Sequence, residues 1–134
     1  MASTVGYSAK TLTQKLGIKP GDVVLAINPP SHYAALLYPL PEGVRVVPVA
    51  DAPRLIHAFF ETTEALLSSV EALSTKPAVG GAIWISWPKK TSPKFVDLTE
   101  NRIRDAVLPT GWVDVKVCAV DDDWSGLKFL RRRA

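Results

Sequence analysis

Residues 22–31 read DVVLAINPPS, and this stretch indicates which kind of fold the chain adopts. Its first six residues, 22–27, are a nearly continuous apolar run of strand length, which is typical of a strand covered on both faces in a parallel sheet. Two successive prolines, Pro29 and Pro30, then end the strand. Ser31 follows as the expected N-cap of a helix that ends near residue 38. A strand, a tight loop and a helix in this order predict an α/β fold.

Strand and helix signals continue to alternate along the rest of the chain. Further strands are expected over 44–49, 55–60, 82–87, 113–120 and 127–131, and further helices over 8–16 (with Ser8 as N-cap), 62–73 and 99–107. Pro48 cannot donate to a ladder, so 44–49 is expected at a sheet edge. We therefore predict one domain over residues 1–134: a three-layer, Rossmann-like, mostly parallel sheet of about six strands, ending in an antiparallel C-terminal hairpin.

The composition is that of a globular chain. Of 134 residues, 47% are hydrophobic and 22% are charged, both close to the average for one domain. The first residues lack the basic and apolar pattern of a secretory signal, and no apolar run approaches the roughly 20 residues of a membrane span. The one cysteine, Cys118, stands in an apolar run and is interpreted as a small buried residue, which fits a reducing compartment. We expect a cytoplasmic protein without a membrane partner.

The positions of the charged residues are more informative than the net charge. A formal net charge of +3 is too small to indicate nucleic acid as a partner. The run 131–133 is all arginine. It is interpreted either as a site for an acidic surface or as protection of an edge strand against pairing with another chain. Self-association through an edge strand stays open.

Ligands of doubly wound sheets bind beyond the carboxyl ends of the strands, so the loop at 28–31, which follows the first strand of the predicted sheet, is the critical one for ligand binding. Asn28 and Ser31 could contact a ligand there. Pro29 and Pro30 between them lack N–H donors and have a fixed φ, so this loop cannot wrap a pyrophosphate as a glycine-rich loop does. We therefore expect no cofactor, neither S-adenosylmethionine nor NAD.

A basic and aromatic loop follows the strand at 82–87. Its lysines could bind a phosphate or carboxylate, and the nearby tryptophans could form a platform for an anionic small molecule or an acidic protein partner. The alternatives are a solvated loop and tryptophans that only pack over a small core. Trp84 and Trp87 differ by an odd number of positions, so they should face opposite sides of the sheet. The candidate ligand-binding residues are Asn28, Ser31, Trp87, Lys89, Lys90, Lys94, Trp124 and Lys128.

Signals for a metal site or for a known catalytic arrangement are weak. The three aspartates at 121–123 lack the spacing of a calcium loop, and the only histidines, His32 and His57, are too few for zinc. No nucleophile elbow and no Cys–His spacing is present. We expect no metal.

Two resemblances add to this interpretation. The segments SWPKK at 86–90 and WSGLK at 124–128 resemble a family of small bacterial proteins known only as a domain of unknown function, and the resemblance extends over residues 6–133. That family implies no activity. The turn at Gly80 and Gly81, followed by strand, helix and terminal hairpin, is similar to the back half of class I methyltransferases. Such a resemblance implies a fold and not a function.

Two hypotheses of different classes follow. The first is a non-catalytic binding or interaction module whose basic and aromatic loop binds an anion. The alternative is an enzyme on a degenerate methyltransferase-like scaffold without a standard S-adenosylmethionine site. In that enzyme Lys89 or Asp97 would transfer a proton, and Asn28 would position the substrate.

Overall fold

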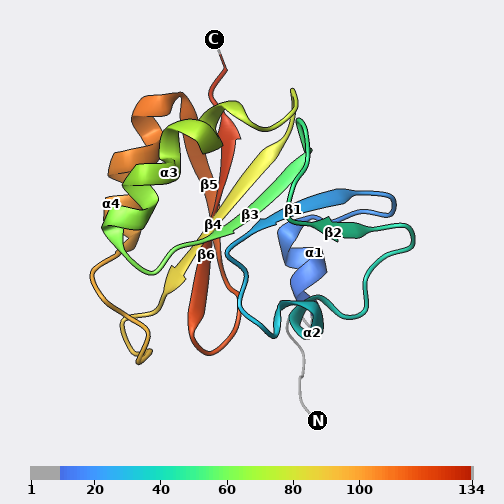
Figure 1. Ribbon diagram of the computed structural model, residues 1–134, viewed down its shortest axis with the longest axis horizontal. Coiled ribbons are helices and arrows are strands. Elements are labelled where there is room, and N and C mark those ends of the chain that lie inside the picture. The colour runs from blue at the N-terminus through green and yellow to red at the C-terminus, as the bar shows by residue number, and fades with distance from the viewer. Residues whose placement is uncertain (1–9, 134) are drawn as a thin grey trace.

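A computed structural model describes residues 10–133 as one six-stranded sheet with helices on both faces (Figure 1). The strands are β1 (Val23–Ile27), β2 (Arg45–Val47), β3 (Leu55–Phe59), β4 (Ala82–Pro88), β5 (Trp112–Ala119) and β6 (Trp124–Arg131). The helices are α1 (Leu12–Leu16), α2 (Tyr33–Leu37), α3 (Thr63–Thr75) and α4 (Glu100–Val107), and a 3₁₀ turn, Leu108–Thr110, follows α4.

The strand order is β2-β1-β3-β4-β6-β5. Strands β2, β1, β3 and β4 run parallel, whereas β6 is antiparallel to both β4 and β5. This confirms the predicted Rossmann-like, mostly parallel α/β sheet with an antiparallel C-terminal hairpin. It also confirms the edge position inferred from Pro48, since the edge strand β2 ends directly before that residue.

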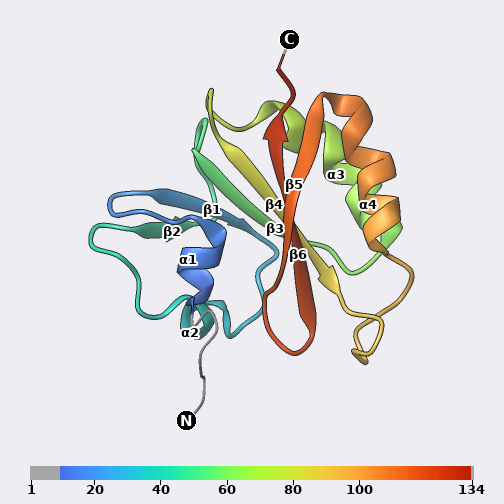
Figure 2. The same cartoon turned by 180° about the vertical axis from the view of Figure 1, so that it is seen from behind.

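Two hydrophobic clusters lie on opposite faces of the sheet. Helices α3 and α4 cover one face, where Leu66 and Ile103 pack against Ile83, Ile85 and other strand residues. The short helices α1 and α2 cover only part of the other face (Figure 2), where Leu16 and Tyr33 pack against strand residues that include Trp84. The odd spacing of Trp84 and Trp87 is thereby confirmed to place them on opposite faces, because Trp87 belongs to the first cluster.

Local capping explains where several helices begin. The Thr99 side chain accepts a hydrogen bond from the Arg102 N–H and caps α4, and Thr62 caps α3 in the same way. Helix α1 begins later than expected, because Thr11 is its N-cap; the predicted cap Ser8 lies outside the described residues. The prediction for Ser31 is wrong: α2 has His32 at its N-cap position and no side-chain cap bond.

The C-terminal hairpin differs from expectation in two respects. Strand β6 begins at Trp124, so this residue lies in the strand and not in the connecting link. Strand β6 is also interior, so the interpretation that the arginines at 131–133 protect an edge strand is wrong. Arg131 instead donates to the Ser74 carbonyl at 3.1 Å, and its guanidinium lies 4.5 Å from the centre of the Trp112 ring. No helix in residues 10–133 has the length and apolar character needed to cross a membrane.

Candidate functional site

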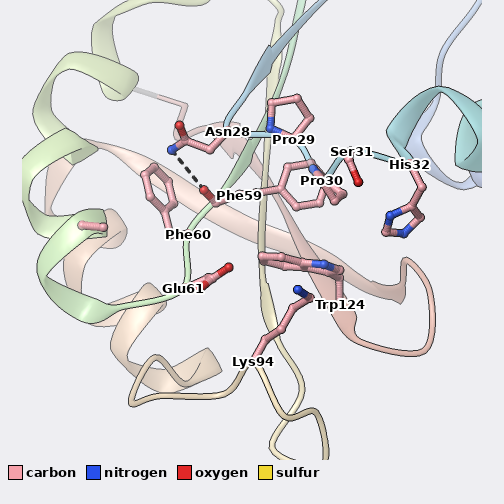
Figure 3. Close-up of a pocket in the computed structure, with 11 residues that line it drawn as sticks. Asn28, Pro29, Pro30, Ser31, His32, Phe59, Phe60, Glu61, Lys94 and Trp124 are labelled. Carbon is pink, nitrogen blue, oxygen red and sulfur yellow. Dashed lines mark hydrogen bonds between the residues drawn. The ribbon is translucent and has the colours of Figure 1, made fainter.

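The strand order places a topological switch point between β1 and β3. From β1 the chain first adds β2 on one side and then β3 on the other, and ligands of open α/β sheets bind where the order reverses. A cavity of about 360 Å³ opens at this point, beyond the carboxyl ends of both strands. We call it the switch-point pocket (Figure 3). It is lined by Asn28, Pro29, Pro30, Ser31, His32, Phe59, Phe60, Glu61, Ala65, Lys94 and Trp124.

Asn28 shapes the entrance by its backbone and its side chain. Its φ of 54° is in the left-handed region, where asparagine is tolerated better than most residues with a side chain. Its side-chain amide donates to the Phe59 carbonyl at 3.3 Å and so joins the ends of β1 and β3. A single asparagine therefore makes a turn of the kind that glycine often makes, while Pro29 and Pro30 leave the following two positions without N–H donors.

Aromatic rings form one wall of the pocket. The Phe59 and Trp124 rings meet edge to face, with centroids 5.0 Å apart. Trp124 is buried, and its indole Nε1 has no hydrogen-bond partner within residues 10–133. An unpaired buried donor costs free energy, on the order of 1–3 kcal/mol. The wall is thus apolar but carries one unsatisfied N–H.

Charged side chains stand on the other sides. Lys94 and Glu61 both extend toward the Trp124 ring (Figure 3), and neither forms an ion pair in the part of the chain that the structure describes. Ser31 adds an exposed hydroxyl at the rim. The pocket therefore combines one cation, one carboxylate and aromatic carbon.

A second contact ties α2 to the β5–β6 hairpin at this rim. His32 Nε2 lies 2.8 Å from Asp121 Oδ2, and Asp121 also accepts hydrogen bonds from the main-chain N–H groups of Asp123 and Trp124. Partial burial raises the pKa of Asp121, but these hydrogen bonds outweigh it and hold the pKa below its ordinary value. The side chain of Asp121 thus organises the turn of the hairpin. No group of three or more His, Cys, Asp or Glu in residues 10–133 is placed to hold a metal ion.

The basic and aromatic loop does not form a single site. Trp87, Lys89 and Lys90 line another cavity of about 430 Å³ beside α4. Because Trp87 and Trp124 lie on opposite faces of the sheet, they cannot form one platform. Four of the eight predicted residues, Asn28, Ser31, Lys94 and Trp124, come together in the switch-point pocket; their contact with a ligand stays a prediction.

Lys128 lies in neither cavity. It pairs across the sheet with Trp84 and with Lys116, and its Nζ lies near Gly17 at the end of α1. The structure therefore does not bring Lys128 together with the lysines of the basic loop, since β6 runs through the sheet interior and Lys128 stands halfway along it, and its contact with a ligand stays a prediction.

The groups considered for proton transfer are also outside the pocket. Asp97 accepts a hydrogen bond from the Thr63 N–H at 2.9 Å, and it forms no ion pair with Lys94 or Arg102 within the described residues. Lys89 donates its main-chain N–H to the Asp123 carbonyl and faces the cavity beside α4.

Sequence reasoning missed a buried polar chain beneath the pocket. His57 Nδ1 lies 2.7 Å from Tyr33 Oη, and His57 Nε2 lies 2.6 Å from Ser86 Oγ. Burial lowers the pKa of His57 to about 3 and raises the pKa of Tyr33. His57 and Ser86 are completely buried, so no substrate can reach this Ser–His pair, and it is a structural network. Glu61 was also missed, although its position directly after a strand was a usable signal.

Comparisons with known proteins bear on the fold. No family model matches the sequence, and no curated protein matches it, so the resemblance to a bacterial family stays a prediction. Solved structures do match. An S-adenosylmethionine-dependent methyltransferase from Aquifex aeolicus has a TM-score of 0.66 and 15% identity, over 88% of this chain and 86% of that one.

Two further solved structures contain bound S-adenosylmethionine. Magnesium protoporphyrin IX methyltransferase from Synechocystis PCC 6803 has a TM-score of 0.61 and 10% identity, over 90% of this chain and 74% of that one. Fibrillarin from Aeropyrum pernix has a TM-score of 0.60 and 13% identity, over 89% of this chain and 73% of that one. The chain has a methyltransferase-like Rossmann fold. Identities this low establish the fold alone.

Proposed function

We propose that this chain is a non-catalytic binding domain whose switch-point pocket holds a small organic anion. The observation that carries the proposal is Lys94, a cation without an ion pair in the described residues, which faces an aromatic wall inside a cavity at the switch point. A cavity of about 360 Å³ is at the lower end of the range for small-molecule sites. The ligand class is a carboxylate, sulfonate or phosphate attached to a planar apolar body.

Each part of such a ligand has a counterpart in the lining. The anion would meet the Lys94 ammonium in a charge-assisted hydrogen bond. The planar body would pack against Phe59, Phe60 and Trp124. A hydroxyl or amino group on the ligand would donate to Glu61. Side chains rather than backbone N–H groups would provide the polar contacts, because Pro29 and Pro30 have none to offer.

A binding role without chemistry is supported by where the reactive groups lie. Asp97 is engaged with the Thr63 N–H, Lys89 faces the other cavity, and the Ser86–His57 pair is sealed in the core. Proton transfer requires a group within hydrogen-bond reach of the substrate, and none of these three groups meets that condition for a ligand in the switch-point pocket. Glu61 and Lys94 do line the pocket, and in this proposal they bind the ligand.

A fluorescence titration with anilinonaphthalene sulfonate tests this proposal, because that probe carries both a sulfonate and an aromatic body. We expect Lys94→Gln to weaken binding about fivefold or more, the scale of one lost charge-assisted contact. Lys89→Gln is the matched control and should leave the affinity unchanged. Equal affinity of Lys94→Gln and the parent protein, or NMR shifts away from residues 28–32 and 59–61, would contradict the proposal.

The alternative, an enzyme on a degenerate methyltransferase-like scaffold, draws support from one observation. Two structurally similar proteins contain bound S-adenosylmethionine, and the pocket of this chain lies at the switch point of a sheet of the same kind. Calorimetry with S-adenosylmethionine discriminates between the two functions. Micromolar affinity would favour the enzyme and would refute the expectation drawn from Pro29 and Pro30.

A further inference from the structure

The sheet has a cationic region that is separate from both cavities. Lys116 on β5 and Lys128 on β6 are directly opposite each other, so their side chains leave the same face of the sheet, the face toward α1. Like charges at directly opposite positions destabilise an antiparallel pair. The chain nevertheless places two lysines there.

Other cations border this pair. Lys19 and Arg54 act electrostatically on Lys128, and Lys15 and Lys116 act together on Cys118. Burial, followed by the repulsion from Lys116, Arg54 and Lys19, lowers the pKa of Lys128 below its ordinary value. The carboxylate of Asp22 is already ion-paired with Arg54, and residues 1–9 contain no acidic side chain. We call Lys15, Lys19, Arg54, Lys116 and Lys128 the basic face.

Apolar groups lie beside these charges, at a part of the sheet that none of the helices in residues 10–133 covers (Figure 2). On the face toward α1, Leu130 is 37% exposed and pairs with Val113. Strand β5 is a sheet edge, and it exposes nearly half of Val115 and Val117. Native proteins usually shield a long edge strand with exposed apolar residues, because its free N–H and C=O groups pair readily with another strand.

We propose that an extended, acidic and apolar segment of a partner protein docks along β5 and over the basic face. Its main chain would pair with the edge of β5, in the manner of β-strand addition. Its acidic side chains would lie beside Lys116 and Lys128, and its apolar side chains beside Val113 and Leu130. This partner site is independent of the ligand proposed for the switch-point pocket, since the two share no residue.

Charge and composition favour this occupant over two others. A second copy pairing its β5 with this one about a two-fold axis would bring Lys116 toward Lys116 of the copy, which is repulsive. Single-stranded nucleic acid is bound on sheets by exposed aromatic side chains that stack on the bases. Within residues 10–133, the basic face and its border contain no exposed aromatic residue.

The test is an NMR titration of the protein with a soluble peptide that combines glutamates and leucines in a glycine–serine background. A second peptide has glutamine in place of glutamate. We expect amide shifts over 113–119 and 126–130 with the glutamate peptide. We also expect Lys116→Gln/Lys128→Gln to weaken binding about fivefold or more, which corresponds to the loss of two exposed charge pairs. Lys89→Gln/Lys90→Gln is the matched control. These two lysines follow the carboxyl end of β4 and are not part of the basic face, so this variant should bind like the parent.

Four results would overturn the proposal. The first is shifts that avoid β5 and β6, and the second is equal loss of affinity in the control variant. The third is tighter binding of oligothymidylate than of the glutamate peptide at this same face, which would assign the face to nucleic acid. The fourth is a concentration-dependent dimer in sedimentation that the Lys116→Gln/Lys128→Gln variant abolishes, which would assign it to a second copy.

Discussion

Replacing His57 by glutamine should flatten the pH dependence of folding stability between about pH 7.5 and pH 4.5. His57 is fully buried and makes hydrogen bonds to two hydroxyl groups, Tyr33 Oη and Ser86 Oγ. Both hydroxyls could accept from a doubly protonated ring, so hydrogen bonding alone would tolerate the charge. The charge is opposed by burial, which lowers the pKa of His57 to about 3 from 6.5.

The sign and size of the effect follow from proton linkage. The unfolded chain binds a proton at His57 near pH 6.5, whereas the folded chain does not until about pH 3. The contribution of neutral His57 to the free energy of unfolding is therefore fully present above about pH 6.5. It falls by about 1.4 kcal/mol per pH unit as the pH drops from 6.5 toward 3. Between about pH 7.5 and 4.5 the loss from His57 alone is about 2.5 kcal/mol, a large share of a typical stability of roughly 5–15 kcal/mol.

Urea denaturation at several pH values measures this loss. Acidic groups do not obscure it, because Asp22, Asp114 and Asp121 have pKa values below their ordinary value of 3.8. Their stabilising contribution is present above that value and disappears only at lower pH. Ser86→Ala is the control, since it removes a hydrogen bond to His57 and keeps the titrating ring, and it should retain the parent slope.

Parallel pH profiles of the parent and His57→Gln would refute this reasoning. If His57→Gln does not fold, the ring carbon shifts of His57 in the parent protein decide the matter. They should stay those of a neutral ring down to about pH 4, well below the ordinary histidine pKa. A titration midpoint near 6.5 would show that burial does not exclude the charge.

Two further predictions concern the backbone and the thiol. A Cβ at Gly81 would lie 2.8 Å from the Arg54 carbonyl oxygen and 2.9 Å from that of Ala78. Gly81→Ala should therefore lower the free energy of unfolding by about 1–3 kcal/mol in urea denaturation. Gly17→Ala is the comparison variant, because its φ of 80° strains the backbone while a Cβ there meets no backbone atom, so it reports the effect of strain without a steric clash. Burial raises the pKa of the Cys118 thiol despite the nearby Lys15 and Lys116, so it should react with a disulfide reagent at pH 7 more slowly than glutathione does; an equal or faster rate would show that the thiol is accessible and ionised.

The elements most accurately predicted from the sequence are those whose signals are local. The strand expected over 22–27 and the helices expected over 62–73 and 99–107 depend on patterns within those segments, and the structure has a strand and two helices there. The position of β6 between β4 and β5 is different, because it depends on which strand pairs with β4 over a long sequence separation. Because β6 is an interior strand, Lys128 does not join the basic loop. For the same reason, the interpretation that the arginines at 131–133 protect an edge strand is wrong.

The candidate site could be predicted only in part, because it too depends on which strands are neighbours in the sheet. Asn28, Ser31 and Lys94 follow strand ends, and the carboxyl ends of neighbouring parallel strands meet at one edge of the sheet. Trp87 and Lys89 satisfy the same local rule, yet they face the α4 side, since the alternation along β4 sends Trp87 into the cluster beneath α3 and α4. The polar chain through His57 could not be predicted from a local pattern, because Tyr33 and Ser86 are 24 and 29 residues away from His57 in the sequence.

The position of the pocket and its chemistry have different origins. Strand order alone places a cavity at the switch point, and structurally similar methyltransferases have a sheet of the same kind. What the cavity can bind depends instead on the donors around it, and Pro29 and Pro30 remove two backbone N–H groups just where Asn28 makes the turn. An adenosine cofactor held by backbone donors and an organic anion held by Lys94 would therefore respond differently to one change. Lys94→Gln should weaken binding of the anion about fivefold or more, and it should leave the affinity for a backbone-bound cofactor unchanged.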